Sequence, residues 1–278
     1  MLIALDPIVL SIGPLTVRWF GLLTLVGLGL AAALSLAALR REGFSATPGL
    51  AALAWAWPAG IVTARLVEVL GWWDYYLAHA AEVWQLSVDR LSLWGGLVGG
   101  ALLLGARVHS RRQPGRHLRV LDTVVPYVAL AVAIAQLGAF LDGHGQGRPT
   151  DLPWATWYAS PLAATPDFGV PRHPAQAYEA LVALGLYLGL TRLPRSWPAG
   201  SRVATFILLF GGARLILGAV RLEPAFLFGL QIEQLIASAA MLYVVLRGLG
   251  AMVSSRRRTS RPTTTSGQPR PTEETLAA

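Results

Sequence analysis

The chain has 278 residues, of which 54% are hydrophobic and 14% charged, and its mean hydropathy is +0.51. This composition indicates a polytopic membrane protein and excludes an ordinary soluble domain. The chain has no cysteine, which excludes disulfides, thiolate nucleophiles and thiolate metal sites. Its formal net charge of +8 comes from arginines beside apolar runs, a pattern that favours membrane topology over nucleic-acid binding.

Seven apolar runs are long enough to cross a bilayer, because a spanning helix needs about 20 mostly apolar residues. In chain order they are Leu15–Leu39, Ala51–Leu70, Leu91–Val108, Val120–Leu141, Ala175–Leu193, Val203–Val220 and Gln231–Leu249. The sequence therefore predicts an all-α polytopic integral membrane protein with seven transmembrane helices in one domain, residues 1–253. The Ser, Thr, Pro and Arg content of residues 254–278 predicts a disordered, basic cytoplasmic tail.

Arginines are concentrated in alternate connecting segments. They follow the first, third, fifth and seventh apolar runs, whereas acidic residues such as Asp74, Asp151 and Glu223 lie in the other segments. By the positive-inside rule the arginine-rich segments are cytoplasmic. This places the N-terminus outside and the C-terminus in the cytoplasm, as an odd number of spans requires.

The segment Asp142–Pro171 between the fourth and fifth runs is long and rich in glycine, proline and aromatic residues. A loop of this length is usually functional or disordered, and its Trp and Tyr content argues against disorder. Its glycines allow backbone N–H groups to approach a ligand and to form an anion-binding nest. The same segment contains His144, which titrates near neutral pH, and Arg148.

Arg214 lies inside the sixth apolar run. A charge inside hydrocarbon costs roughly 2.5–3.5 kcal/mol, so it is kept where it faces a polar partner, such as a phosphate or a carboxylate. Arg221 follows two helical turns later on the same face. Together with Arg148 and Arg172, these arginines predict a site for the anionic headgroup of an outer-leaflet lipid.

Polar residues also mark the neighbouring ends of the fourth and fifth runs. Gln136 lies near the end of the fourth run and can hydrogen-bond a headgroup. His173, Gln176 and Glu179 follow an i, i+3, i+6 spacing, which predicts one shared helical face. His173 is interpreted either as a structural interface histidine or as a catalytic group. The small residues Gly95–Gly100 predict close helix packing.

These residues carry a resemblance to the prolipoprotein diacylglyceryl transferase family. The segment Arg172–Glu179 resembles the family's Arg-His-Pro-Ser-Gln-Leu-Tyr-Glu in six of eight positions. The segment Gln136–Arg148, which includes Gly138, lies where the family has Gly-Arg-x-Gly-Asn-Phe-x-Asn-x-Glu-x-x-Gly. Three shorter segments resemble its first-helix motif, its His-Gly-Gly-Leu block and its arginine-bearing sixth helix: Arg18–Leu22, Leu93–Leu97 and Gly211–Arg214.

The resemblance implies transfer of a diacylglyceryl group from phosphatidylglycerol to the lipobox cysteine thiol of preprolipoproteins, in the bacterial inner (plasma) membrane. The partners that it implies are phosphatidylglycerol, preprolipoproteins and membrane lipids. It implies no nucleic-acid partner, no cofactor and no metal. With this activity we expect Arg214 to act at the phosphate, and His144, in the signature loop, is the best remaining candidate base. The expected substrate-binding residues are Gln136, Gly138, Arg148, Arg172, His173, Gln176, Glu179 and Arg221.

Several family positions carry other residues in this chain. Trp94 replaces a histidine, Gln136 an arginine, His144 a glutamate, Phe210 a tyrosine and Gly218 a glutamate, while the signature asparagines are replaced by Ala139 and Asp142. An alternative function therefore stays open. In this alternative the chain is a catalytically impaired paralog that binds phospholipid or a signal peptide without chemistry.

Overall fold

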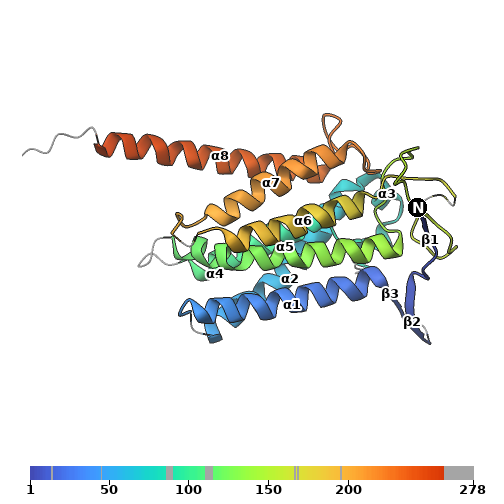
Figure 1. The fold of residues 1–278 in the computed structure, drawn as a ribbon, viewed down its shortest axis with the longest axis horizontal. Coiled ribbons are helices and arrows are strands. Elements are labelled where there is room, and N and C mark those ends of the chain that lie inside the picture. Colours follow the sequence, from blue (N-terminus) through green and yellow to red (C-terminus); the bar gives the residue numbers. More distant parts are fainter. Residues whose placement is uncertain are drawn as a thin grey trace, which may run out of the picture. The chain divides into compact units, whose positions relative to one another are not determined.

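The computed structural model describes residues 1–13, 15–44, 46–85, 90–109, 115–165, 167, 169–194 and 196–259. They belong to two compact units, Met1–Met241 and Leu242–Ala278. Long helices occupy the regions of all seven predicted runs (Figure 1). They are α1 (Trp19–Arg41), α2 (Ala46–Gly71), α4 (Leu93–Val108), α5 (Arg116–Asp142), α6 (Ala175–Arg192), α7 (Ser201–Gly218) and α8 (Ile232–Thr259).

Four of these helices are both long and apolar enough to cross a membrane: α1, α5, α7 and the segment Ile232–Ala251 of α8. The helix α4 is apolar but shorter. Large apolar side chains such as Leu25, Leu102 and Ile216 are exposed, with exposed fractions of 62%, 69% and 75%. Exposed apolar faces on apolar helices are typical of segments that contact lipid. The membrane character of the chain is confirmed, whereas seven crossings remain a prediction.

The N-terminal segment corrects the predicted start of the first helix. Residues Leu15–Arg18 form strand β3, which pairs antiparallel with β2 (Ile8–Ile12), and α1 begins only at Trp19. A second pair joins β1 (Leu2–Ile3) to β4 (Trp157–Tyr158) in parallel. Apolarity alone did not separate strand from helix at Leu15–Arg18. The all-α description therefore holds for the long helices, with two small sheets added.

The C-terminal boundary also differs from the prediction. Helix α8 continues to Thr259, so residues 254–259 are helical rather than part of a disordered tail. The helix-forming arginines Arg256–Arg258 explain this extension, because Arg has a high helix propensity. The rest of the predicted tail, residues 260–278, lies outside the described residues.

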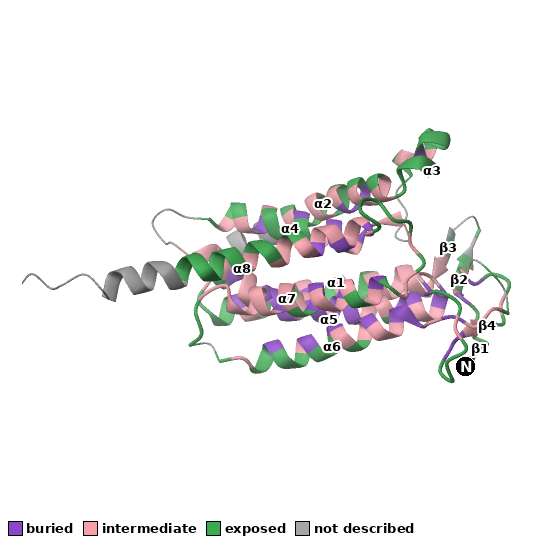
Figure 2. Ribbon diagram, turned by 90° about the horizontal axis from the view of Figure 1, so that it is seen from above, coloured by how far each residue is buried: buried purple, intermediate pink, exposed green. Residues whose placement is uncertain are grey.

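Helix α5 is the most buried of the long apolar helices. Half of the residues in its most apolar segment are buried, which Figure 2 shows by colour. Helix α5 packs against α1, α4, α6 and α7. Gly138 permits the contact with α1, because a Cβ atom there would lie 2.8 Å from the backbone oxygen of Trp19. The predicted close packing of α4 is confirmed at Gly95, where a Cβ atom would lie 2.6 Å from the backbone oxygen of Thr63 in α2.

Two short helical turns, α3 (Trp73–Ala78) and a 3₁₀ helix at Ala80–Trp84, follow α2. Arg65, which is 7% exposed, holds this region by donating to the backbone oxygens of Val83, Arg90 and Glu82 and to the Tyr76 hydroxyl. This arginine therefore has neutral acceptors around its guanidinium group.

Candidate active site

Arg214 lies in the last turn and a half of α7 and is 2% exposed. Its Nη1 is 3.2 Å from Oε1 of Glu179, and its Nη2 is 2.9 Å from Oε2 of Glu233. It also pairs with Glu223 and donates to Oε1 of Gln231 at 3.2 Å. These contacts compensate the buried charge, which the sequence required to face a polar partner.

Arg221 follows α7, at the start of the α7–α8 connection (residues 219–231). Its Nη1 lies 3.0 Å from Oε1 of Glu179, and its Nε donates to Oε1 of Glu223 at 2.6 Å. Burial raises the pKa of Glu223, but Arg221 and Arg214 outweigh burial and hold that pKa below its usual range. Glu223 is therefore ionised at neutral pH.

We call Arg214, Arg221, Glu179, Glu223 and Glu233 the Arg–Glu cluster. It contains three carboxylates for two guanidinium groups, and its residues come from α6, α7, α8 and the α7–α8 connection. The arginines are therefore neutralised as the structure stands. An anionic ligand that reaches them must displace a carboxylate, because a surplus of buried negative charge is costly.

Two polar side chains fix the cluster from other helices. Gln136 of α5 donates its Nε2 to Oε2 of Glu179. Ser92, which caps the N-terminus of α4, donates its hydroxyl to Oε1 of Glu233 at 2.6 Å. The amide of Gln136 therefore contacts a carboxylate of the cluster, and its predicted contact with a headgroup stays a prediction.

The glycine-rich start of the α5–α6 connection (residues 143–174) lies over Arg221. A Cβ atom on Gly145 would be 3.3 Å from Nη2 of Arg221. The N–H groups of Gly147 and Arg148 donate to the backbone oxygens of His173 and Val220, at 2.9 and 2.7 Å. These two N–H groups therefore donate within the protein and are not free to form the predicted anion-binding nest. The Arg148 side chain is exposed.

His144 lies in the same connection and is half-buried. Its ring stacks on Phe20 of α1, with ring centroids 4.9 Å apart and planes 16° apart. Its backbone oxygen accepts from Nε2 of Gln176 at 2.8 Å, and Gln176 is fully buried. The residue next in the chain, Gly145, faces Arg221, so the His144 backbone borders the cluster.

His173 departs from the predicted helical ladder. Helix α6 begins at Ala175 with Pro174 as its N-cap, so His173 precedes the helix and does not share the face of Gln176 and Glu179. Its Nδ1 is 3.5 Å from the Tyr178 hydroxyl instead. The predicted i, i+3, i+6 spacing is therefore wrong at His173. A residue that precedes a proline is disfavoured in the helical conformation, so the helix begins only after Pro174.

Arg172 is also engaged within the α5–α6 connection and is 3% exposed. It donates to the backbone oxygen of Gly147 at 3.2 Å and pairs with Asp167. Its backbone bridges to Thr156 through hydrogen bonds of 2.9 and 3.0 Å. The structure thus separates Arg172 and His173, which hold the connection, from Arg214, Arg221 and Glu179, which it brings together.

The positions that depart from the family pattern have well-defined packing partners. Trp94 stacks on Phe210, with centroids 5.3 Å apart, and Phe210 stacks on Phe206. A Cβ atom on Gly218 would overlap the side-chain amide of Gln234, whose Nε2 donates to the backbone oxygen of Leu215 at 3.1 Å. Each replacement is thus accommodated by neighbouring side chains, with Trp94 and Phe210 forming a matched pair.

Sequence reasoning missed several residues of this site. The sequence places Glu223 in a connecting segment and Glu233 at the outer end of the seventh run, without linking either of them to Arg214, and the pattern did not single out Ser92, Gln231 or Gln234. The polar spacing Gln231, Glu233, Gln234 at the start of the seventh run was an available signal. Arg18 was also missed, although its Nη2 pairs with Asp142 at 2.6 Å and joins the start of α1 to the end of α5.

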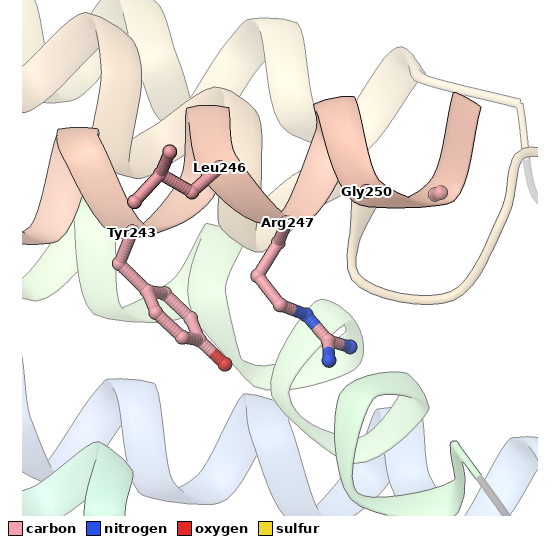
Figure 3. Close-up of a pocket in the computed structure, with 5 residues that line it drawn as sticks. Tyr243, Leu246, Arg247 and Gly250 are labelled. Atoms are coloured by element: carbon pink, nitrogen blue, oxygen red, sulfur yellow. The ribbon is translucent and has the colours of Figure 1, made fainter. Parts of the chain in front are cut away.

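The second unit carries a cavity of about 480 Å³, lined by Tyr243, Leu246, Arg247, Gly250 and Ala251 (Figure 3). All of these residues belong to α8, so the cavity is an open hollow along one helix. None of them belongs to the Arg–Glu cluster. Among the described residues, no group of three or more His, Cys, Asp and Glu side chains has an arrangement that could hold a metal ion.

The chain is similar to proteins of one family along most of its length. The sequence model described as prolipoprotein diacylglyceryl transferase matches residues 7–250. The chain is 32% identical to the phosphatidylglycerol–prolipoprotein diacylglyceryl transferase of Bordetella parapertussis, over 92% of this chain and 98% of the relative. It is 30% identical to that of Cupriavidus pinatubonensis, over 98% of both chains. Identity to that of Finegoldia magna is 28%, over 87% of this chain and 94% of the relative.

Proposed function

Because the chain belongs to the prolipoprotein diacylglyceryl transferase family, we propose that it transfers a diacylglyceryl group from phosphatidylglycerol to the cysteine thiol of preprolipoproteins. The observation that carries this proposal at the level of residues is the buried pair Arg214 and Arg221, which converges on shared carboxylates. The relatives bear the name of the enzyme, which favours catalysis over the binding-only alternative.

The chemistry defines what the site must do. The cysteine sulfur forms a C–S bond to the terminal carbon of the diacylglyceryl group. The bond between that carbon and the phosphate oxygen breaks, and the other glycerol leaves as glycerol phosphate. The thiol proton must be lost, because the thiolate is the competent nucleophile. The charge that develops on the departing phosphate requires donors in a low-dielectric site.

In this proposal Arg214 binds the phosphate through its planar fork of donors. Arg221 assists from the α7–α8 connection, because α7 ends at Gly218 and the expected shared helical face with Arg214 is wrong. Arg148, which is exposed, supplies a charge at the rim. Glu179 and Gln136 position the two arginines, since Gln136 holds Glu179 and Glu179 contacts both guanidinium groups. Gly138 acts by allowing α1 to approach α5.

For His144 we propose the role of base toward the thiol. Its neutral ring accepts a proton in the physiological range, and its backbone borders the cluster beside Gly145. The contact with Phe20 sets the plane of the ring. Arg172, His173 and Gln176 then serve substrate binding by holding the α5–α6 connection in place over the cluster.

We further propose that the chain crosses the bacterial inner membrane seven times, with the N-terminus outside. The arginine-rich ends of α1, α6 and α8 support this orientation by the positive-inside rule. Since there is no native cysteine, single introduced cysteines test it. Asp151→Cys should react with an impermeant maleimide in intact cells, and Trp197→Cys only after permeabilisation. The reverse pattern would refute the orientation.

The function is tested by complementation of a strain depleted of its own transferase. The native gene should restore growth and the diacylglyceryl modification of a reporter prolipoprotein, seen as a mass increase of its N-terminal peptide. Arg214→Lys should insert and yet fail to complement. Absence of modification by the native protein, at normal membrane levels, would contradict the proposed transferase activity.

A further inference from the structure

Glu223 is anchored differently from the other two carboxylates of the Arg–Glu cluster. Glu179 belongs to α6, is held by Gln136 and has a side chain 6% exposed. Glu233 belongs to the first turn of α8, accepts from Ser92 and has a side chain 15% exposed. Glu223 lies in the non-helical α7–α8 connection, and its side chain is 24% exposed. Of the three, it is the carboxylate with the best access to solvent.

Glu223 contacts the two arginines with the same arrangement of oxygens that a phosphodiester would use. Its Oε1 accepts from Nε of Arg221 at 2.6 Å, and its Oε2 pairs with Nη2 of Arg214. One group thus bridges two guanidinium groups with two oxygens that share one negative charge. A phosphodiester has two free oxygens and one negative charge, so it satisfies the same donors at the same net charge.

The surrounding backbone allows Glu223 to leave while Arg221 stays. The start of the connection is pinned, because Arg148 donates to the backbone oxygen of Val220 and Gly147 bridges to Arg221. The side chains beyond Glu223 are exposed: Phe226 and Leu227 are 45% and 48% exposed, and Phe228 is 89% exposed. The backbone there forms a local turn, in which the N–H groups of Phe226 and Leu227 donate to the backbone oxygen of Leu230. Segments that bury few apolar contacts open at lower cost than packed helices.

We propose that Glu223 is an internal competitor for the phosphate of the lipid substrate. In the free protein its carboxylate neutralises Arg214 and Arg221, and a singly charged phosphodiester binds by displacing it. This proposal rests on the proposed function and adds to it the ligand exchange at the arginines. The exchange keeps the charge of the cluster constant, so the site is matched to a monoanionic diester.

The same exchange favours release of the product. Glycerol phosphate is a phosphate monoester, which carries about −1.5 to −2 charges at pH 7 because its second pKa is near 6. Binding it in place of Glu223 would leave additional negative charge beside Glu179 and Glu233, which are buried. The carboxylate of Glu223 therefore displaces the product more readily than it displaces the substrate.

The affinity of the Glu223→Gln variant for phosphatidylglycerol tests the proposal. Binding of dihexanoyl phosphatidylglycerol to the detergent-solubilised full chain is measured by calorimetry. Removing a competitor raises the apparent affinity by the inverse of the fraction of time that the arginines were free, so a site free one tenth of the time gains about tenfold. The matched control is Glu82→Gln, which removes a carboxylate that pairs with Arg90 outside the Arg–Glu cluster and should not raise the affinity.

A second measurement follows the connection itself. A single cysteine at Leu227, which is 48% exposed, carries an environment-sensitive fluorophore in a chain that has no other cysteine. Addition of dihexanoyl phosphatidylglycerol should change its emission, and dihexanoyl phosphatidylcholine should not. Inorganic phosphate at the same concentration should leave both signals unchanged, and a response as large as that to the lipid would overturn the assignment to a lipid headgroup.

The outcomes separate the two proposals. A wild-type chain that binds the lipid through Arg214, combined with weaker binding in Glu223→Gln, would overturn the competitor role and leave the transferase function intact. A wild-type chain with no saturable binding of phosphatidylglycerol would overturn both. Higher affinity in Glu223→Gln, together with the fluorescence response, is the expected result.

Discussion

Two buried arginines in this chain, Arg65 and Arg214, differ in what surrounds them. Arg65 is 7% exposed and donates to three backbone oxygens and one tyrosine hydroxyl. Arg214 is 2% exposed and contacts three carboxylates. Burial in an apolar helix therefore does not distinguish the structural Arg65 from Arg214, for which we propose a binding role. The partners do, because backbone oxygens are fixed whereas a carboxylate can be exchanged for a phosphate.

The largest expected effect is the loss of transfer in Arg214→Lys. A lysine keeps the charge but loses the fork of donors that contacts two acceptors at once, and removing one such donor in an active site costs about 10²–10³-fold in turnover. Transfer of the diacylglyceryl group to a synthetic lipobox peptide, followed by mass spectrometry, measures it. Arg65→Lys serves as the matched control and should retain turnover per folded molecule. Equal losses in both variants would remove the distinction between them.

The next effect concerns the proposed base. His144→Ala should slow transfer by about 10²-fold, at the lower end of the usual range for general-base assistance, without weakening phosphatidylglycerol binding. The pH profile of the remaining activity should also lose its limb near the histidine pKa. A variant with unchanged rate and unchanged profile would instead leave the positive charge of the arginines as the source of thiolate.

For Arg65 the expected effect is on stability. Arg65→Met leaves three partly buried backbone oxygens without these donors, and a fully buried group of this kind costs about 1–3 kcal/mol. The midpoint of thermal unfolding in detergent should therefore fall clearly, and more than in Arg214→Lys, in which a charge still faces the carboxylates. A midpoint equal to that of the wild type would show that the region from Trp73 to Trp84 does not depend on Arg65.

The smallest effect is the pH dependence of stability that Glu223 contributes. Its folded-state pKa is lowered by Arg221 and Arg214, so its contribution is present above the unfolded-state value, near ~4.3, and is lost as the pH falls through the lower folded-state value. The difference in unfolding midpoint between wild type and Glu223→Gln should therefore be present at pH 7 and shrink below about pH 4. A difference that does not depend on pH would argue against an ionised Glu223.

The sequence predicted those parts of the molecule that depend on local patterns. Apolar runs located the long helices, and the charge of Arg214 within one of them located the cluster. The sequence did not show that Glu223 and Glu233 contact Arg214. The path of the α7–α8 connection brings them together, and no sequence periodicity predicts that path. The error at Leu15–Arg18 has the opposite origin: the segment adjoins a long apolar run, but its partner strand Ile8–Ile12 decides its conformation.

Titration of dihexanoyl phosphatidylglycerol, observed by ³¹P NMR, tests most directly the claim that Arg214 binds the lipid phosphate. Wild type and Arg65→Lys should both shift or broaden the phosphorus resonance in a saturable way, and Arg214→Lys should do so far more weakly. Equal saturable binding by Arg214→Lys and wild type would contradict the account, because the phosphate would then lie elsewhere.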